Sequence, residues 1–148
     1  MNIQTLLGRF WKAKKIESVY IVSINEGVSV ITGLTHFIMD QKIVAGKISG
    51  AGISSHLTMR FFNPNKKNNE YAEFFNTYEI INILGSFFMI QKDPVLTLDV
   101  ILKKESHTTL SGSLIDAEIS GMNNFFIFPV GSGSIPHQHQ FSDAQNWN

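Results

Sequence analysis

Cysteine is absent from this 148-residue sequence, which excludes disulfide bridges, thiolate metal sites and a cysteine nucleophile. Charged residues are scarce as well, at 16% of the chain, whereas about a quarter is usual. The 12 basic and 12 acidic residues give a net charge of zero, which argues against broad electrostatic binding of nucleic acid. We therefore expect no nucleic-acid partner.

Long apolar runs are missing too, so no segment reaches the length of a membrane span. The first residues also lack the basic start, apolar middle and small-residue cleavage site of a signal peptide. These absences predict a soluble, cytoplasmic protein. Apolar residues still make up 43% of the chain, enough for a core without covalent staples. We expect one domain over residues 1–131, followed by a polar tail over residues 132–148.

Alternation of apolar and polar residues is the main structural signal, and it is clearest from Pro94 to Ile119. Leu96, Leu98 and Val100 lie on one side of an extended chain, and residues 104–107 form a polar interruption. The pattern then resumes and changes parity close to Gly112. It predicts an antiparallel hairpin of two strands with a bulge near that glycine.

Further extended runs bring the expected number of short strands to about eight, which is typical of an antiparallel barrel or sandwich. We predict a mainly β fold, an up-and-down β-barrel, because a closed barrel leaves no strand edges exposed. A β-sandwich is the alternative. The architecture is similar to that of small calycin-like or allene-oxide-cyclase-like barrels, although the sequence carries no motif of those families. Residues 70–78 fit a helix and a strand equally well.

A helix is expected at the N-terminus. The helical spacing i, i+3, i+4, i+7, i+8 is filled by apolar residues at Ile3, Leu6, Leu7, Phe10 and Trp11. It predicts a short helix over residues 2–15, lying across one end of the barrel. Residues 28–39 are instead predicted to be a strand, with Leu34, His36 and Ile38 on one face.

Pairs of adjacent phenylalanines occur at residues 61–62, 74–75, 87–88 and 125–126. Neighbouring residues of a strand point to opposite faces of the sheet. Each pair in a strand therefore places one ring in the core and one ring outside it. A sheet that is apolar on both faces needs a cover, so we expect a homo-oligomer, with a homodimer as the simplest form.

The candidate site residues follow from the same alternation. His36 lies between Leu34 and Ile38 on its predicted face, so it is expected to point inward and to act as a catalytic acid or base. Tyr78 and Asn82 share one face of a later strand and are the expected ligand-binding companions, with Arg60 as a further one.

No cofactor or metal is expected. His137 and His139 resemble the first half of the cupin metal motif, but Asp143 stands where that motif has a glutamate. The second half of the motif also has no room before Asn148.

Two functions of different classes remain open. The first is binding of a small, largely apolar molecule in a barrel cavity, with cofactor-free isomerase or cyclase activity as a sub-case. The alternative is a non-enzymatic interaction or assembly module that uses its outward aromatic faces. The sequence does not decide whether the protein is an enzyme.

Overall fold

The computed structural model describes residues 2–103 and 108–131, and for residues 76–79 it describes the backbone alone. The elements in chain order are β1 (Ile3–Leu7), β2 (Trp11–Ile16), β3 (Val19–Ile24), α1 (Val30–Gln41), β4 (Ala45–Asn63), β5 (Asn68–Ile90), β6 (Asp93–Lys103) and β7 (Thr109–Pro129). The predicted turn at residues 104–107 and the predicted tail at residues 132–148 lie outside the described residues.

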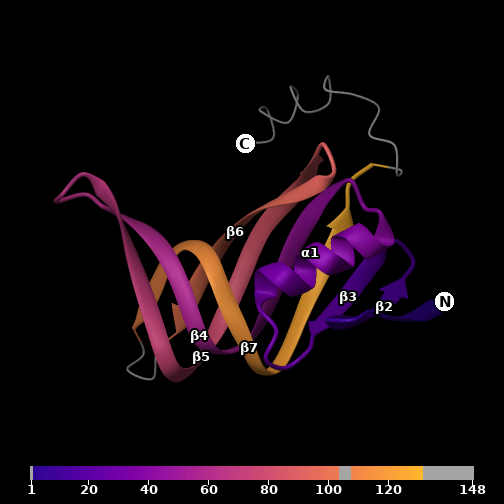
Figure 1. Ribbon diagram of the computed structural model, residues 1–148, viewed down its shortest axis with the longest axis horizontal. Helices are drawn as coiled ribbons and strands as arrows, with labels where there is room; N and C mark the ends of the chain where they lie inside the picture. Colours follow the sequence, from indigo (N-terminus) through magenta and orange to yellow (C-terminus); the bar gives the residue numbers. More distant parts are fainter. Residues whose placement is uncertain (1, 104–107, 132–148) are drawn as a thin grey trace.

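The seven strands form one antiparallel sheet in the order β1-β2-β3-β7-β4-β5-β6 (Figure 1). The expectation of a mainly β, antiparallel fold is confirmed. β7 also pairs with β6, so β4, β5, β6 and β7 close a ring. The up-and-down barrel is not confirmed, because this ring runs through four strands only and β7 lies between β3 and β4. The described strands do not form the second sheet that a sandwich requires.

The predicted hairpin between Pro94 and Ile119 is confirmed as β6 and β7. Their antiparallel register pairs Asp99 with Ser113 and Leu102 with Leu110. The register of β7 with β4 then shifts opposite Leu114, close to the bulge expected near Gly112. Residues 70–75, which fitted a helix or a strand, belong to β5.

The far halves of β4 and β5 form a hairpin, residues 55–75, that projects from the rest of the sheet (Figure 1); we call it the arm. A register shift between Ser54 and His56 marks its base, and the Ser54 hydroxyl donates a hydrogen bond of 2.9 Å to the His56 carbonyl. Before this shift, buried residues of β4 such as Ile48 have even numbers, and after it buried residues such as Leu57 and Met59 have odd numbers. The bulge therefore changes which side chains of β4 face the core.

The predicted helix over residues 2–15 is wrong, since this segment is the hairpin of β1 and β2. Its turn is closed by the Gly8 amide, which donates to the Trp11 carbonyl over 2.9 Å. Within β2, Trp11 and Ala13 are buried while Lys12 and Lys14 are exposed. That local alternation with period two decides the structure, because it lets β2 pair with β3.

The helix lies where a strand was predicted, at Val30–Gln41. Its buried residues recur at i, i+3, i+4, i+7 and i+8, namely Val30, Gly33, Leu34, Phe37 and Ile38. The Ser29 side chain accepts a hydrogen bond from the Thr32 amide at the start, and Lys42 ends the helix in the left-handed conformation. At Gly33, an added Cβ would come within 2.8 Å of the Ile24 side chain, so glycine permits the close approach of α1 to β3.

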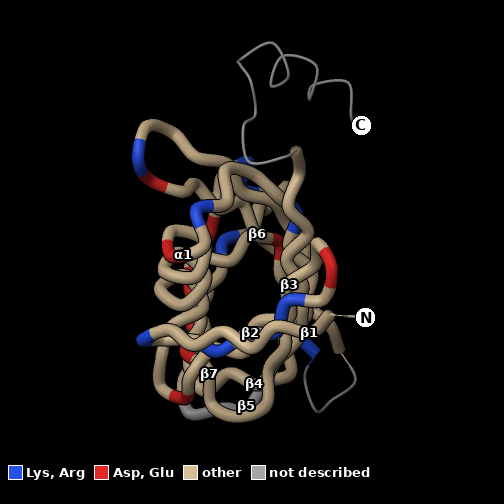
Figure 2. Tube along the Cα trace, turned by 90° about the vertical axis from the view of Figure 1, so that its right-hand side faces the viewer, with Lys and Arg blue, Asp and Glu red and all other residues tan. Residues whose placement is uncertain are grey.

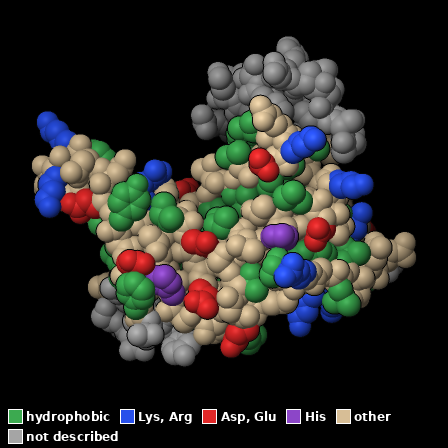
Figure 3. Space-filling view, viewed as in Figure 1, with side chains coloured by type: hydrophobic (Ala, Val, Ile, Leu, Met, Phe, Trp, Pro, Cys, Tyr) green, Lys and Arg blue, Asp and Glu red, His purple; other side chains and the backbone are tan. Residues whose placement is uncertain are grey.

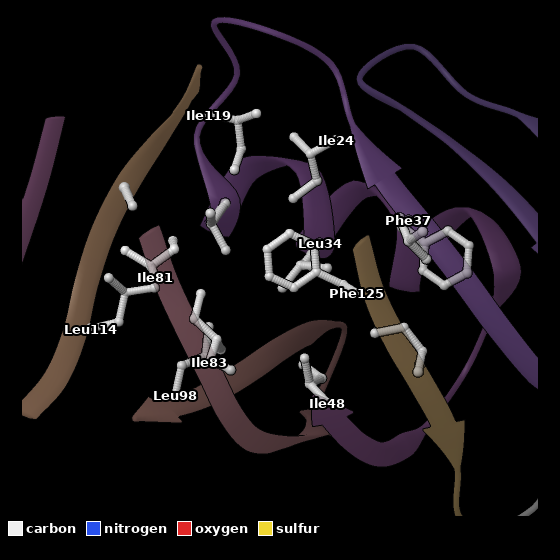
Figure 4. Close-up of a cluster of buried hydrophobic side chains, with 14 of the residues drawn as sticks. Ile24, Leu34, Phe37, Ile48, Ile81, Ile83, Leu98, Leu114, Ile119 and Phe125 are labelled. Atoms are coloured by element: carbon white, nitrogen blue, oxygen red, sulfur yellow. The ribbon is translucent and has the colours of Figure 1, made fainter. Parts of the chain in front are cut away.

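The core lies between α1 and one face of the sheet. Figure 4 shows Leu34 and Phe37 of the helix with Ile24, Ile48 and Phe125 of three strands. The Phe37 ring makes edge contacts with the Trp11 and Tyr20 rings, at centroid distances of 4.8 and 5.1 Å. One helix therefore covers one face of the sheet, and the other face has no comparable cover among the described residues.

Candidate functional site

The sheet face opposite α1, which we call the open face, carries the candidate sites. Backbone pairing aligns one row of its residues across all seven strands: Thr5, Lys14, Ile21, Phe126, Ser49, Leu84, Asp99 and Ser113. Only Lys14 and Asp99 in this row are charged. This row is thus uncharged over four neighbouring strands, whereas the next row on the same face carries the exposed Lys47 of β4, which pairs with Phe128.

A groove of about 790 Å³ lies on this face. All four strands of the ring contribute to it, because the ring makes the open face curl. Its polar lining includes Arg60, Asn82, Asp99, Ser111 and Ser113. Its apolar lining includes Phe62, Leu84 and Ile101. Arginine, a carboxylate, hydroxyls and apolar side chains thus meet in one space.

Register fixes the relation between the two charged groups of the groove. Ser113 of β7 pairs with Arg60 of β4 on one side and with Asp99 of β6 on the other. Arg60 and Asp99 are therefore two strand spacings apart, about 10 Å between their backbones. Neither side chain has a hydrogen-bond or ion-pair partner among the described residues.

The structure brings Arg60 and Asn82, two of the predicted ligand-binding residues, to the lining of the same groove. Tyr78 belongs to β5 by its backbone, but its side chain lies outside the described part of the chain. Asp99, Ser111 and Ser113 were missed as site residues. The alternation in β6 and β7 could have indicated them, because it places Asp99 on the sheet face away from the buried Leu98 and Val100.

His36 is not part of the groove. The prediction that it points inward is wrong, because residues 30–41 are a helix and His36 lies on its exposed side. Its ring contacts the Phe10 ring edge-on at a centroid distance of 4.7 Å. In a helix, Leu34 and His36 lie about 200° apart around the axis, so burying Leu34 turns His36 toward solvent. A catalytic site built around His36 has no structural basis.

A second feature of the open face is an apolar patch, made of Ile21, Leu84, Phe88, Val95, Phe126 and Phe128. Leu84 is 65% exposed, and Phe126 and Phe128 are 39% and 42% exposed. The last two rings stack at a centroid distance of 6.5 Å. Three of the members, Ile21, Phe126 and Leu84, belong to the uncharged stretch of the row described above. Ser49 of β4 lies between Phe126 and Leu84 in that row.

Basic residues form a third feature, along β2 (Figure 2). Lys12 and Lys14 are exposed beside Leu7, and they line a smaller groove of about 450 Å³ with Ile21 and Ser23. Lys15 lies over the Tyr20 ring at 5.4 Å. The chain has no acidic residue before Glu17, so this edge of the sheet is positive although the protein is neutral.

Comparison with known families identifies the fold. Residues 12–130 match the Plants and Prokaryotes Conserved (PCC) domain. The chain belongs to the PCC domain family. No curated protein matches the chain.

Three solved structures illustrate the similarity to other PCC-like folds. A candidate DNA-binding protein from Bacteroides thetaiotaomicron is 29% identical, with a TM-score of 0.75, over 84% of this chain and 87% of that one. A metal-containing protein from Archaeoglobus fulgidus is 19% identical, with a TM-score of 0.68, over 86% of each chain. A candidate DNA-binding protein from Ralstonia eutropha is 18% identical, with a TM-score of 0.65, over 78% of each chain.

These similarities correct the expectation that nucleic acid is not a partner. Two of the three similar structures are of candidate DNA-binding proteins, which conflicts with that expectation. That expectation rested on the net charge of the whole chain, which does not show that the edge at β2 is positive. The comparisons give no support for the expected binding of an apolar molecule or for isomerase or cyclase activity.

Among the described residues, no group of three or more His, Cys, Asp and Glu side chains is placed to hold a metal ion. The groove itself offers one carboxylate, Asp99, and its other charged group is the cation Arg60. The described helix is also too short and too polar to cross a membrane.

Proposed function

We propose that this PCC domain is a non-enzymatic assembly module whose apolar patch binds a second copy of the chain. The observation that carries the proposal is the alternation in β7. Phe125 and Ile127 are buried in the core, whereas Phe126 and Phe128 are exposed on the other face of the same strand. Exposed aromatic residues are typical of the centre of a protein interface.

The charges of the molecule favour a second copy as the partner. The net charge is zero, so two copies do not repel each other at long range. The uncharged stretch of the row reaches from Ile21 to Leu84, about 14 Å across three strand spacings. With a polar rim around it, a stretch of this width suits the centre of an interface of about 800 Å² per partner.

The test is analytical ultracentrifugation of the full chain over a range of protein concentrations. The unmodified chain is expected to sediment as an oligomer of 16.6 kDa units, and the double variant Phe126→Lys/Phe128→Lys as a 16.6 kDa monomer. Met39→Lys is the matched control, because Met39 is 46% exposed on α1 and away from the patch. A monomeric unmodified chain at high concentration overturns the proposal, as does a double variant that still associates.

A second function, binding of DNA, is favoured by the positive edge at β2. Lys12 and Lys14 are two residues apart on one face of a strand, so both ammonium groups are available to one sugar-phosphate backbone. The relative from Bacteroides thetaiotaomicron, a candidate DNA-binding protein, points the same way. Such binding is electrostatic, independent of sequence and sensitive to salt.

Fluorescence anisotropy with a labelled DNA duplex, measured at several salt concentrations, tests this second function. The double variant Lys12→Gln/Lys14→Gln is expected to weaken binding and to reduce the slope of log K against log salt by about 2. Lys66→Gln/Lys67→Gln, at the tip of the arm, is the control with the same change in net charge. Figure 3 shows that basic tip at a distance from the body. Equal losses in the two double variants contradict a specific role for β2.

A further inference from the structure

The groove of the ring carries two opposite charges that do not pair with each other. Arg60 and Asp99 both line it and flank Ser113 from opposite strands. Neither has an ion-pair partner among the described residues. Here one strand separates them, so each charge remains available to a ligand that enters between them.

The separation of the two groups defines the size of such a ligand. Their backbones are about 10 Å apart, and a charge-assisted hydrogen bond takes up about 2.8 Å at each end. Side chains stand roughly perpendicular to a sheet and so keep this separation, which leaves about 4 Å between the two contacts. That span suits a compact zwitterion, which has its carboxylate and its ammonium group on one carbon atom. A single charged group would satisfy only one end of the groove.

The remaining lining indicates what else the ligand carries. The hydroxyls of Ser111 and Ser113 and the amide of Asn82 line the groove and accept or donate hydrogen bonds. Phe62, Leu84 and Ile101 offer apolar surface among them, since Ile101 pairs with both Asn82 and Ser111. Leu84 and Ile101 are 65% and 49% exposed, so burying them under a ligand removes apolar surface from water.

We propose that this groove binds a free α-amino acid with an apolar side chain. Arg60 binds the carboxylate through its guanidinium fork, Asp99 accepts hydrogen bonds from the ammonium group, and the apolar wall receives the side chain. Asn82 and Ser113 make further hydrogen bonds to the carboxylate and ammonium groups of the ligand. The site overlaps the apolar patch at Leu84, but Phe126 and Phe128 do not line the groove. The inference does not rest on self-association.

Isothermal titration calorimetry of the full, unmodified chain provides the first test, with three probes that differ in charge alone. L-leucine carries both charged groups, 4-methylpentanoate lacks the ammonium group and 3-methylbutylamine lacks the carboxylate. L-leucine is expected to bind at least about tenfold more tightly than either analogue, since each charged contact contributes separately. No measurable binding of L-leucine at millimolar concentration overturns the proposal, as does equal affinity for the three probes.

Two substitutions assign the charges. Arg60→Gln is expected to weaken L-leucine at least about tenfold and to leave 3-methylbutylamine unchanged. Asp99→Asn is expected to weaken L-leucine by a similar factor and to leave 4-methylpentanoate unchanged. Arg9→Gln and Asp93→Asn are the matched controls, because they make the same chemical changes outside the groove. Loss of binding in these controls, or its persistence in both groove variants, overturns the assignment.

Self-association is measured on the same samples. Arg60→Gln and Asp99→Asn are expected to sediment like the unmodified chain, and Phe126→Lys/Phe128→Lys is expected to retain L-leucine binding. Failure of the amino-acid site thus appears in calorimetry alone, and failure of the assembly proposal appears in sedimentation alone.

Discussion

Aromatic side chains lie on both sides of the sheet, but they differ in how far they are buried. On the face beneath α1, Phe37 contacts Trp11 and Tyr20, and all three are buried. On the open face, Phe126 and Phe128 are 39% and 42% exposed, although they alternate with buried residues of the same strand. The difference lies in cover, since one 12-residue helix is about 18 Å long and shields one face only. A hydrophobic side chain is thus buried only where a neighbouring element covers it.

The largest expected contrast comes from removing one ring on each face. Phe37→Ala leaves a cavity among packed rings and is expected to lower the free energy of unfolding by about 3–5 kcal/mol. Phe128→Ala is expected to lower it by less than about 1 kcal/mol, because that ring is already partly in water. Urea unfolding at one fixed protein concentration measures both, since association adds to apparent stability. Equal losses would show that the open face is also packed in solution.

The next contrast concerns a polar group of the packed face. Asn123 is buried, and its side chain accepts from the Ile24 amide over 2.7 Å and donates to the Ile24 carbonyl over 2.9 Å. Asn123→Ala leaves both backbone groups without these partners and is expected to cost about 2–4 kcal/mol. Asn124→Ala is the control, since Asn124 is the exposed neighbour on the open face. Unfolding curves that coincide for the two variants contradict this account.

A smaller effect is expected at the start of the covering helix. Ser29→Ala removes the acceptor of the Thr32 amide and is expected to cost about 1 kcal/mol. Asp116 of β7 supports the same turn, because its Oδ1 accepts from the Ile31 amide over 3.2 Å. Ser29→Asp keeps a capping acceptor and is expected to restore most of the stability. If Ser29→Asp is as unstable as Ser29→Ala, the cap is not the cause of the loss.

The smallest effect is expected at His36, on the side of α1 that faces solvent. His36→Ala is expected to change the free energy of unfolding by less than about 0.5 kcal/mol, as is usual for exposed positions. L-leucine binding is expected to stay unchanged as well, since His36 does not line the groove. Thermal unfolding and calorimetry of this variant check both statements. A loss of several kcal/mol would show that the edge contact with Phe10 is more than a surface contact.

The strands were easier to predict than the helix. In β6 and β7, Leu96, Leu98 and Val100 alternate with polar residues, and the structure confirms the hairpin. In residues 30–41 the β-branched Val30, Ile31 and Thr32 favour a strand, yet the segment is helical. The buried positions of this segment fit helical spacing, but the apolar positions between residues 3 and 11, which form strands, fit it as well. Local pattern alone does not distinguish the two segments, because partners distant in sequence decide which hydrogen bonds form.

The candidate groove was partly predictable for the same reason. Arg60 was selected because it lies away from the apolar face of its strand, and Asn82 because it shares a strand face with Tyr78. The structure places Arg60 and Asn82 in one concavity. His36 was selected on the assumption that residues 28–39 form a strand. Because the structure has a helix there, His36 does not line the groove. In the sequence, Asp99 only alternates with the apolar residues around it, which predicts an ordinary surface position. Only the pairing of Ser113 with two different strands brings it opposite Arg60.

The sequence by itself determined that the chain is mainly β, that its strands are apolar on both faces and that cysteine chemistry is excluded. These properties depend on composition and on spacing along the chain. The tertiary structure decided which segment became the helix, which face that helix covered, and that four strands close a ring around a groove. Those outcomes depend on contacts between residues far apart in the sequence, such as Ser113 with Arg60 and Trp11 with Phe37, and such contacts have no counterpart in local periodicity.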